Sequence, residues 1–278
     1  WDAIANMHAQ GSGSEFYRIE QWLAGESKIA PWEIEELGPV KGKSLLHLQC
    51  HIGTDTLSWA REGAIVTGLD FSKQAINEAR RFAEILDFPE AKFVVSHVKD
   101  AVAALKGEKF DIIYTGRGAL CWLPNLDEWA SICAQLVKPG GVLYLEECHP
   151  FSDLMEVVGT GSEKELKIHY NMFSKKPVTF HDQGSYADKD AKTGIRKSHC
   201  WGHGFGEIMN SLINNGFNIE MMNEREESFL MKQFSTDELK QRYKEYREEW
   251  YRRGKEFDEI EQDILIDIFD QTASNRYL

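Results

Sequence analysis

The chain has 278 residues, of which 42% are hydrophobic and 12% aromatic, enough for one large domain with a sizeable core. It carries 45 acidic and 32 basic side chains. The resulting net charge of -13 repels phosphate backbones and argues against a nucleic-acid partner. The same acidity fits a cationic or neutral small molecule, or serves only solubility.

The five cysteines are odd in number and lie scattered through the chain, several of them in apolar segments. This pattern is typical of reduced thiols in a cytoplasmic protein and not of a disulfide framework. No apolar run approaches the roughly 20 residues of a membrane span, and the first ten residues lack a signal-peptide pattern. We therefore expect a cytoplasmic protein with no membrane partner.

Short apolar strands alternate with helices over the first 150 residues. Strands are expected at residues 45–48, 64–69, 93–96, 110–115 and 142–146. Helices are expected between them at residues 54–62, 72–87, 98–105 and 126–137. This order predicts an α/β fold: a doubly wound, mostly parallel, Rossmann-like sheet with helices on both faces. A ligand is expected at the carboxyl edge of the strands.

The regular pattern ends at residue 150. Residues 151–199 show no further strand–helix unit, and so long an irregular stretch predicts a lid inserted after the fifth strand. A helix at 206–214 and a sixth strand at 217–221 are expected next. A C-terminal helix over 236–270 carries an apolar stripe that packs on its own domain or on a partner, so an oligomer is possible. A seventh strand lies near 228–234, or the chain is cut within it.

These elements predict one domain over residues 1–278. Its parts are an N-terminal helical segment at 1–40, a cofactor-binding core at 43–150, a substrate lid at 151–200, and the end of the core with the C-terminal helix at 201–278.

The turn after the first strand, Gln49-Cys50-His51-Ile52-Gly53, precedes a helix and a second strand that ends in Asp70. This arrangement is typical of a nucleotide-binding unit in which the acid binds ribose hydroxyls. Gln49 and His51 stand where dinucleotide-binding turns carry glycines. The turn therefore favours a nucleoside without phosphates, which relaxes the demand for glycines.

Four segments in this order resemble the class I S-adenosylmethionine (SAM)-dependent methyltransferases. They are residues 47–53, 68–72, 93–98 and 136–143, the last containing Lys138-Pro139-Gly140-Gly141. The resemblance covers residues 43–148, with weaker support from 202–222. It implies an enzyme that uses SAM and releases S-adenosylhomocysteine. The cofactor site that it implies comprises Tyr17, His47, Gln49, Cys50, His51, Gly53, Asp55, Asp70, Phe71, Ser72, His97, Val98 and Thr115.

Two positions depart from the family pattern. His47 stands where the family often has an acid facing the SAM amine, and His97 where it has an acid near the adenine. Asp55 is a candidate to replace the first acid. Asp70 would accept hydrogen bonds from both ribose hydroxyls, and Phe71 would lie along the adenine. In the N-terminal segment, Tyr17 and Trp22 are expected to close over the cofactor.

The turn after the fourth strand, Thr115-Gly116-Arg117-Gly118, lacks both the motif of nucleic-acid or amide methyltransferases and the acids of a metal-dependent site. A small-molecule methyl acceptor is therefore expected. His149 and His203 are the candidate bases for its deprotonation, followed by His181, unless each is a structural histidine. Arg117 binds an acidic substrate group or is a surface charge. The aromatic residues expected to wall the pocket are Trp122, Tyr186 and Trp201.

Rival interpretations of the same residues are weaker. No metal is expected at His47, Cys50 and His51, because a strand turns His47 and Cys50 to different sides. None is expected at His199, Cys200 and His203, because no second ligand pair follows at zinc-finger spacing. Cys148-His149 could be a nucleophile pair, but packing is more usual at a strand end. The alternative functions are a non-catalytic SAM-binding or scaffold protein and, disfavoured by the turn, a nicotinamide dehydrogenase.

Overall fold

The computed structural model describes residues 1–150, 155–158, 165–171, 173–188 and 190–224. The chain divides into two compact units. The first contains Trp1–Asp153 and Asn171–Glu224 and carries the features discussed below. The second includes an antiparallel hairpin of β6 (Met155–Val158) and β7 (Glu165–Ile168). The predicted seventh strand near 228–234 and the C-terminal helix over 236–270 lie outside the described residues.

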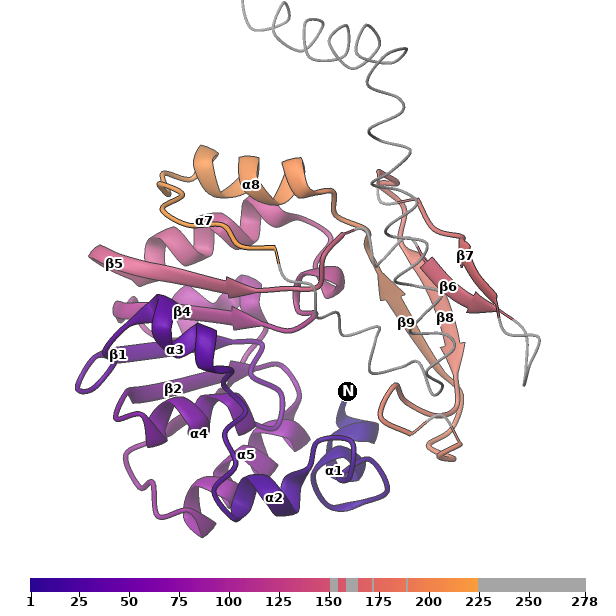
Figure 1. Ribbon diagram of the computed structural model, residues 1–278, viewed down its shortest axis with the longest axis horizontal. Helices are drawn as coiled ribbons and strands as arrows, with labels where there is room; N and C mark the ends of the chain where they lie inside the picture. Colours follow the sequence, from indigo (N-terminus) through magenta and orange to yellow (C-terminus); the bar gives the residue numbers. More distant parts are fainter. Residues whose placement is uncertain (151–154, 159–164, 172, 189, 225–278) are drawn as a thin grey trace, which may run out of the picture. The chain divides into compact units, whose positions relative to one another are not determined.

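Five parallel strands form the central sheet of the first unit, in the order β3-β2-β1-β4-β5 (Figure 1). Their bounds are β1 Ser44–Leu48, β2 Ile65–Asp70, β3 Lys92–Val95, β4 Phe110–Gly116 and β5 Val137–Glu146. The doubly wound Rossmann-like sheet predicted from the sequence is thus confirmed. Strand order reverses between β1 and β4, and ligands of such sheets bind at the carboxyl ends of the strands beside that point.

Successive residues of the central strands serve opposite faces of the sheet. Leu46 and Ile113 belong to the core under α6 (Ala101–Ala104), α7 (Leu126–Leu136) and α8 (Phe205–Asn214). Leu45 and Ile112 belong to the opposite core, with Trp59 of α4 (Thr54–Arg61). Because both faces of the sheet are covered, the central strands carry apolar residues on both sides, as Leu45, Leu46, Ile112 and Ile113 do. The predicted helices between the strands are confirmed.

The helix between β2 and β3, α5 (Lys73–Ile85), is capped by Ser72 as predicted. The Ser72 hydroxyl accepts the Ala75 N–H at 3.1 Å and donates to the carboxylate of Asp2 at 2.6 Å. Asp2 opens the N-terminal helix α1 (Asp2–Gln10), which packs against α5. The N-terminal segment continues with α2 (Ile19–Leu23) and α3 (Pro31–Leu37). The expectation that Trp22 of α2 closes over the cofactor is wrong, because its ring is fully buried in the core against Phe82.

Two expectations for the later part of the chain are wrong. Residues 178–182 and 196–200, expected to be irregular, form the antiparallel hairpin β8 (Val178–Asp182) and β9 (Arg196–Cys200). The hairpin of β6 and β7 falls in the same stretch. Polar side chains intervene along β8 and β9, so these strands lack the continuous apolar runs that marked the core strands.

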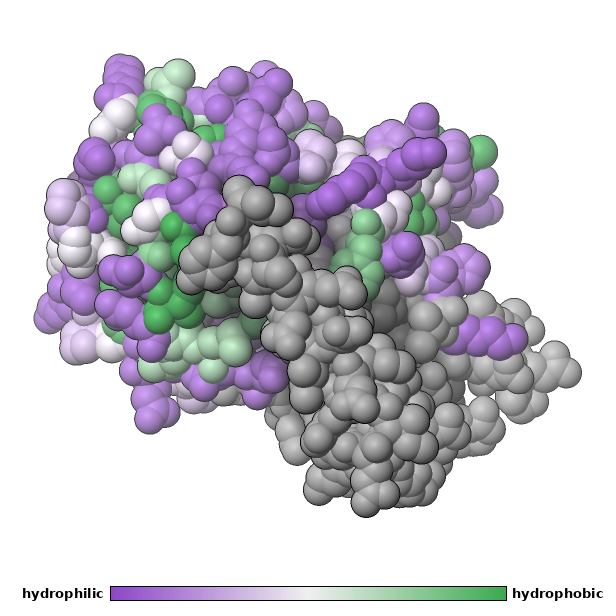
Figure 2. Space-filling view, turned by 90° about the horizontal axis from the view of Figure 1, so that it is seen from above, coloured by the Kyte–Doolittle hydropathy of each residue, from purple (hydrophilic) through white to green (hydrophobic). Residues whose placement is uncertain are grey.

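Residues 217–221 do not form the predicted sixth strand, although the helix before them, α8, is present. Only Phe217 packs against the core, while Ile219, Met221 and Met222 stay exposed. Figure 2 looks down on the face that carries α8, where apolar side chains gather among polar ones. An alternating apolar pattern does not lead to strand pairing when its apolar side chains have no core to pack against. None of the described helices is long and apolar enough to cross a bilayer.

Candidate functional site

The turn between β1 and α4 has an unusual backbone. Gln49, His51 and Gly53 have φ angles of 58°, 48° and 76°, all in the left-handed region. The sequence suggested that this turn does not require glycine conformations, but two non-glycine residues adopt them, at a cost of roughly 1–2 kcal/mol each. At Gly53 a side chain is also excluded by space, because a Cβ would lie 2.7 Å from that of Ala79. Strain of this kind concentrates at functional sites.

Asp70 at the end of β2 faces this turn. One carboxylate oxygen accepts the backbone N–H of His51 at 2.9 Å, and the other accepts that of Ser72 at 2.8 Å. The side chain is buried, and burial raises its pKa, although the two N–H groups oppose that shift. Two fixed N–H donors hold the carboxylate in one orientation at the carboxyl edge of the sheet.

Aromatic rings lie beyond Asp70 at the tips of β2 and β3. Phe71 and His97 stack with ring centroids 5.0 Å apart and an interplanar angle of 10°. Phe71 is 44% exposed and His97 is exposed, so a flat, accessible ring pair stands beside the buried carboxylate. Val98 follows in the short 3₁₀ helix η1 (Val98–Asp100).

His47 and Cys50 are both buried, and both are neutral. Burial lowers the pKa of His47 to about 4. Its Nδ1 lies 2.8 Å from the Thr56 hydroxyl, and its ring meets that of Tyr114 edge-on. Burial likewise raises the pKa of the Cys50 thiol, which packs closely against Gly68. Among the described residues, no three His, Cys, Asp or Glu side chains are grouped as a metal site would require.

Two buried polar atoms at this edge lack hydrogen-bond partners among the described residues. They are Oε1 of Gln49, just after β1, and Oγ1 of Thr115, near the end of β4. The amide nitrogen of Gln49 donates to the Ala119 carbonyl at 3.0 Å, which fixes the orientation of that side chain. An unpaired buried polar group costs about 1–3 kcal/mol, so such atoms indicate a place where a ligand or water supplies the partner.

Histidine and tyrosine side chains from separate segments cover the turn. His8 of α1 is buried between His51, 2.8 Å from its Nδ1, and Ser185, 2.8 Å from its Nε2. The hydroxyls of Tyr17 and Tyr186 bond to each other. Trp1 and Trp122 complete the ring cluster, with centroids 5.1 Å apart. These contacts join the N-terminal segment to residues 185–186, directly over the turn after β1.

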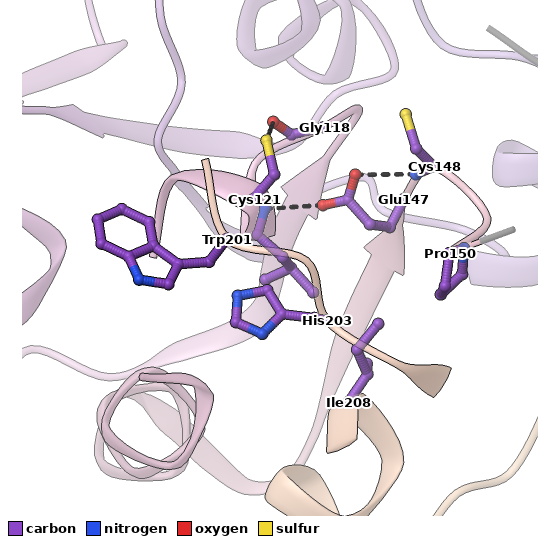
Figure 3. A pocket seen from close by; sticks show the side chains of 9 residues that line it. Gly118, Cys121, Glu147, Cys148, Pro150, Trp201, His203 and Ile208 are labelled. Atoms are coloured by element: carbon purple, nitrogen blue, oxygen red, sulfur yellow. Dashed lines mark hydrogen bonds between the residues drawn. The ribbon is translucent and has the colours of Figure 1, made fainter. Parts of the chain in front are cut away.

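A pocket lies beside the ends of β4 and β5 (Figure 3). Its walls are mainly apolar, with one carboxylate and one imidazole: Gly118, Leu120, Cys121, Glu147, Cys148, Pro150, Trp201, His203 and Ile208. Glu147 accepts the N–H groups of Ala119, Leu120 and Cys148 at 2.8–2.9 Å, and burial raises its pKa. It therefore anchors the loop that carries the pocket wall.

His203 is the buried imidazole of this pocket. Its Nε2 lies 2.8 Å from the Leu123 carbonyl, which only accepts, so Nε2 carries a proton. Its Nδ1 has no hydrogen-bond partner among the described residues and lies 3.5 Å from a carboxylate oxygen of Glu207. His149 differs: it is half exposed, bonds to Glu224 at 2.6 Å, and does not line the pocket.

Comparison with known proteins shows the family. Residues 46–143 match the sequence profile of a methyltransferase domain. The chain is 35% identical over 182 residues to the ubiquinone biosynthesis O-methyltransferase of Salmonella arizonae, covering 64% of this chain and 72% of that protein. The chain belongs to the class I SAM-dependent methyltransferases. The enzyme of the same name from Klebsiella pneumoniae is 34% identical over 173 residues, with coverages of 58% and 69%.

Solved structures of this methyltransferase family share the fold. A SAM-dependent methyltransferase from Clostridium acetobutylicum superposes with a TM-score of 0.54 at 14% identity, covering 78% of this chain and 94% of that one. One from Mesorhizobium loti gives 0.51 at 21% identity, with coverages of 73% and 86%. Because the chain belongs to this family, the protein is an enzyme and SAM is its cofactor.

The geometry of this methyltransferase fits SAM. Asp70, the strained turn and the unpaired atoms of Gln49 and Thr115 lie together at the carboxyl edge where strand order reverses. We propose that the cofactor is held here, with the ribose at Asp70 and the adenine at Phe71 and His97. Ser72 is less available, because its hydroxyl already caps α5 and bonds Asp2.

Sequence reasoning missed several residues near the proposed cofactor and acceptor sites. His8 and Glu33 come from N-terminal helices without any motif, so nothing in their local sequence marked them. Glu147 could have been found, because an acid directly after a parallel strand lies at the ligand-binding edge.

Proposed function

We propose that this methyltransferase methylates a hydroxyl group of a small molecule whose reacting end enters the pocket at the ends of β4 and β5. The curated relatives are named O-methyltransferases, which supports a hydroxyl as the acceptor. The apolar walls and the indole of Trp201 favour a flat, aromatic acceptor such as a phenol. The backbone N–H of Trp201 donates to the Cys121 carbonyl at 2.8 Å, which ties both sides of the pocket together.

The observation that carries the proposal is the hydrogen bonding of the two ring nitrogens of His203. Because Nε2 donates to the Leu123 carbonyl, Nδ1 is the ring nitrogen that has no hydrogen-bond partner in the described part of the chain. A hydroxyl acceptor must lose a proton as it is methylated, and we assign the role of the base to this nitrogen. The Glu207 carboxylate then stabilises the imidazolium, and burial excludes water.

SAM supplies an already activated methyl group, so the protein mainly aligns the acceptor and removes its proton. Trp201 and Leu120 orient the acceptor ring, and Glu147 holds the loop beneath it. His203 receives the hydroxyl proton at Nδ1. His149 lies outside the pocket lining, so His203 alone of the two predicted bases is proposed for this role.

A panel of phenols, catechols, aliphatic alcohols and amines, incubated with enzyme and SAM, tests the proposal. Methylated phenols and equimolar S-adenosylhomocysteine are expected by mass spectrometry. His203→Gln keeps a donor for the Leu123 carbonyl but removes the base, so kcat should fall about 100-fold. SAM affinity should stay unchanged. His199→Gln, outside the pocket on β9, is the matched control. Methylation of amines only, or full activity of His203→Gln, would refute the proposal.

A further inference from the structure

The amino-acid end of SAM carries an ammonium and a carboxylate, and each needs an opposite charge or a hydrogen-bond partner. In this chain the strand-one position that resembles the family's acid is His47. That ring is buried and bonded to Thr56, and burial lowers its pKa to about 4. His47 is therefore neutral at physiological pH and supplies no negative charge. Another group must balance the ammonium.

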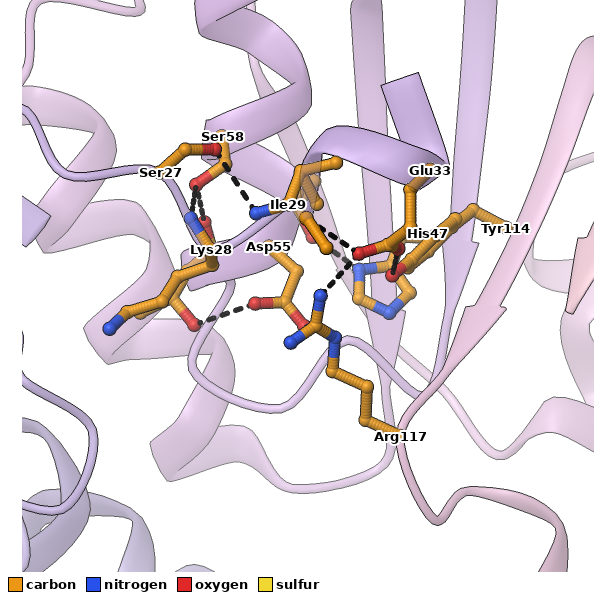
Figure 4. A network of polar contacts seen from close by, with 12 residues as sticks. Ser27, Lys28, Ile29, Glu33, His47, Asp55, Ser58, Tyr114 and Arg117 are labelled. Atoms are coloured by element: carbon orange, nitrogen blue, oxygen red, sulfur yellow. Dashed lines mark hydrogen bonds and ion pairs between the residues drawn. The ribbon is translucent and has the colours of Figure 1, made fainter. Parts of the chain in front are cut away.

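Three charged side chains meet beside His47 (Figure 4). The guanidinium of Arg117, just past β4, lies between the carboxylates of Glu33 and Asp55. Its Nε is 3.8 Å from an Asp55 oxygen, and a terminal nitrogen bonds Glu33. Burial opposes the charge of Arg117, but Asp55, Tyr114 and Glu33 together raise its pKa, so it stays protonated.

The three charged groups differ in their remaining capacity to bind a ligand. Glu33 is completely buried, and its oxygens are engaged by the Tyr114 hydroxyl at 2.7 Å, the Ala30 N–H at 2.8 Å and Arg117. Asp55 and Arg117 retain exposed fractions of 20% and 36%. Glu33 is thus positioned to orient Arg117, while Asp55 and Arg117 can contact a ligand.

The unpaired atoms lie at the same strand ends. β1 and β4 are neighbours in register, with His47 opposite Tyr114. In this register Leu48 is level with Thr115, and Gln49 follows one residue later, so Gln49 and Thr115 belong to adjacent strand ends. Their oxygens, Oε1 and Oγ1, are buried acceptors without a partner in the described part of the chain. An ammonium has three donors and no acceptor, so it matches this set.

We infer that this chain binds the amino-acid end of SAM through a relocated ion cluster. Asp55 and the oxygens of Gln49 and Thr115 receive the ammonium, and Arg117 binds the carboxylate. Glu33 is a positioning residue that holds Arg117 through α3. The backbone of Arg117 supports this role, because its φ of 66° is left-handed and is fixed by an N–H bond to Glu146. The inference rests on the family's cofactor and not on the proposed acceptor.

Two ligands separate the amino-acid end from the rest of the cofactor. S-adenosylhomocysteine carries it, whereas 5′-methylthioadenosine keeps the adenosine and thioether but lacks it. Calorimetry without any acceptor should show that Arg117→Gln and Asp55→Asn each lower the affinity for S-adenosylhomocysteine at least tenfold. The same variants should bind 5′-methylthioadenosine within twofold of the wild type. Glu33→Gln should act only through Arg117, so adding it to Arg117→Gln should cause no further loss of S-adenosylhomocysteine affinity.

Asp111→Asn is the matched control, because it removes another carboxylate that joins β4 to β1, paired with Lys138 at the opposite end of the strands. It should change neither affinity. Arg117→Lys keeps the positive charge but lacks the planar guanidinium, so it should lower the affinity for S-adenosylhomocysteine and not that for 5′-methylthioadenosine. This variant keeps the test available if Arg117→Gln is unstable. Equal loss of both ligands in folded variants, or unchanged S-adenosylhomocysteine affinity, would overturn the inference. Failure to methylate any hydroxyl would leave it standing, since no acceptor is present.

Discussion

The imidazoles of His8 and His51 share a hydrogen bond, with Nδ1 of His8 lying 2.8 Å from Nε2 of His51. One residue belongs to the first helix and the other to the turn after β1, so the bond joins the N-terminal segment to the proposed cofactor site. A shared proton requires at least one neutral ring. Burial lowers the pKa of His8 to about 4, helped by the nearby Arg196, and burial lowers that of His51 well below its usual range.

Stability should therefore fall in mild acid. Above pH 6.5 these histidines are neutral in both folded and unfolded chains, so they cause no pH dependence. Between pH 6.5 and about 4 the unfolded chain binds protons that the folded chain excludes, and the free energy of unfolding decreases as the pH falls. The loss is on the order of 3 kcal/mol for His8. Urea unfolding at pH 7.5, 6, 5 and 4.5 measures it.

His8→Gln is the control, because its amide can bond both His51 and Ser185 without titrating. The slope between pH 6.5 and 4 should be smaller in this variant. An identical slope in both proteins would show that His8 does not exclude the proton.

Asp70→Asn should weaken SAM binding about tenfold or more. The variant removes the ionised acceptor from the proposed ribose site, and charge-assisted hydrogen bonds contribute about 1.5–3 kcal/mol. Its amide group would also face one of two fixed donors, the N–H groups of His51 and Ser72. Isothermal titration with SAM measures the change. A dissociation constant within twofold of the wild type would contradict the proposed ribose site.

The Tyr17 and Tyr186 hydroxyls should be energetically coupled. Tyr17→Phe and Tyr186→Phe each remove their shared hydrogen bond but keep the ring contacts with the neighbouring aromatic side chains. A double-mutant cycle on SAM affinity should give a coupling energy of about 0.5–1.5 kcal/mol. Additive effects would mean that this contact does not help to close the cofactor site.

Trp22→Ala should destabilise the fold by about 3–5 kcal/mol, because it leaves a large cavity in the core. The ring is fully buried, packs edge-on against Phe82 and donates to the Ser58 hydroxyl at 3.0 Å. Ile85→Ala, at an exposed position on α5, should change stability by no more than about 0.5 kcal/mol. Equal unfolding midpoints of the Trp22→Ala variant and the wild type would show that α2 is dispensable for the core.

Local patterns predicted the central sheet well. Leu45, Leu46, Ile112 and Ile113 are apolar because both faces of the sheet are covered, and Ser72 marks the start of a helix. The pattern failed at residues 217–221, where apolar alternation continues but no interior receives it. It also failed at the hairpin of β8 and β9, whose strands are partly polar. The assignment of residues 1–278 to one domain stays a prediction.

The sequence by itself determined the α/β fold, the methyltransferase family and the position of Asp70, because these depend on short-range periodicity and on motifs in a fixed order. Only the tertiary structure decided which side chains share the site. His8 of α1 and Tyr17 both contact His51 in the turn after β1, Glu33 of α3 bonds Tyr114 and Arg117, and Arg117 lies 3.8 Å from Asp55. Such contacts join residues far apart in the chain, so local sequence patterns do not predict them. The neutrality of His47 was likewise decided by burial, which depends on the whole fold.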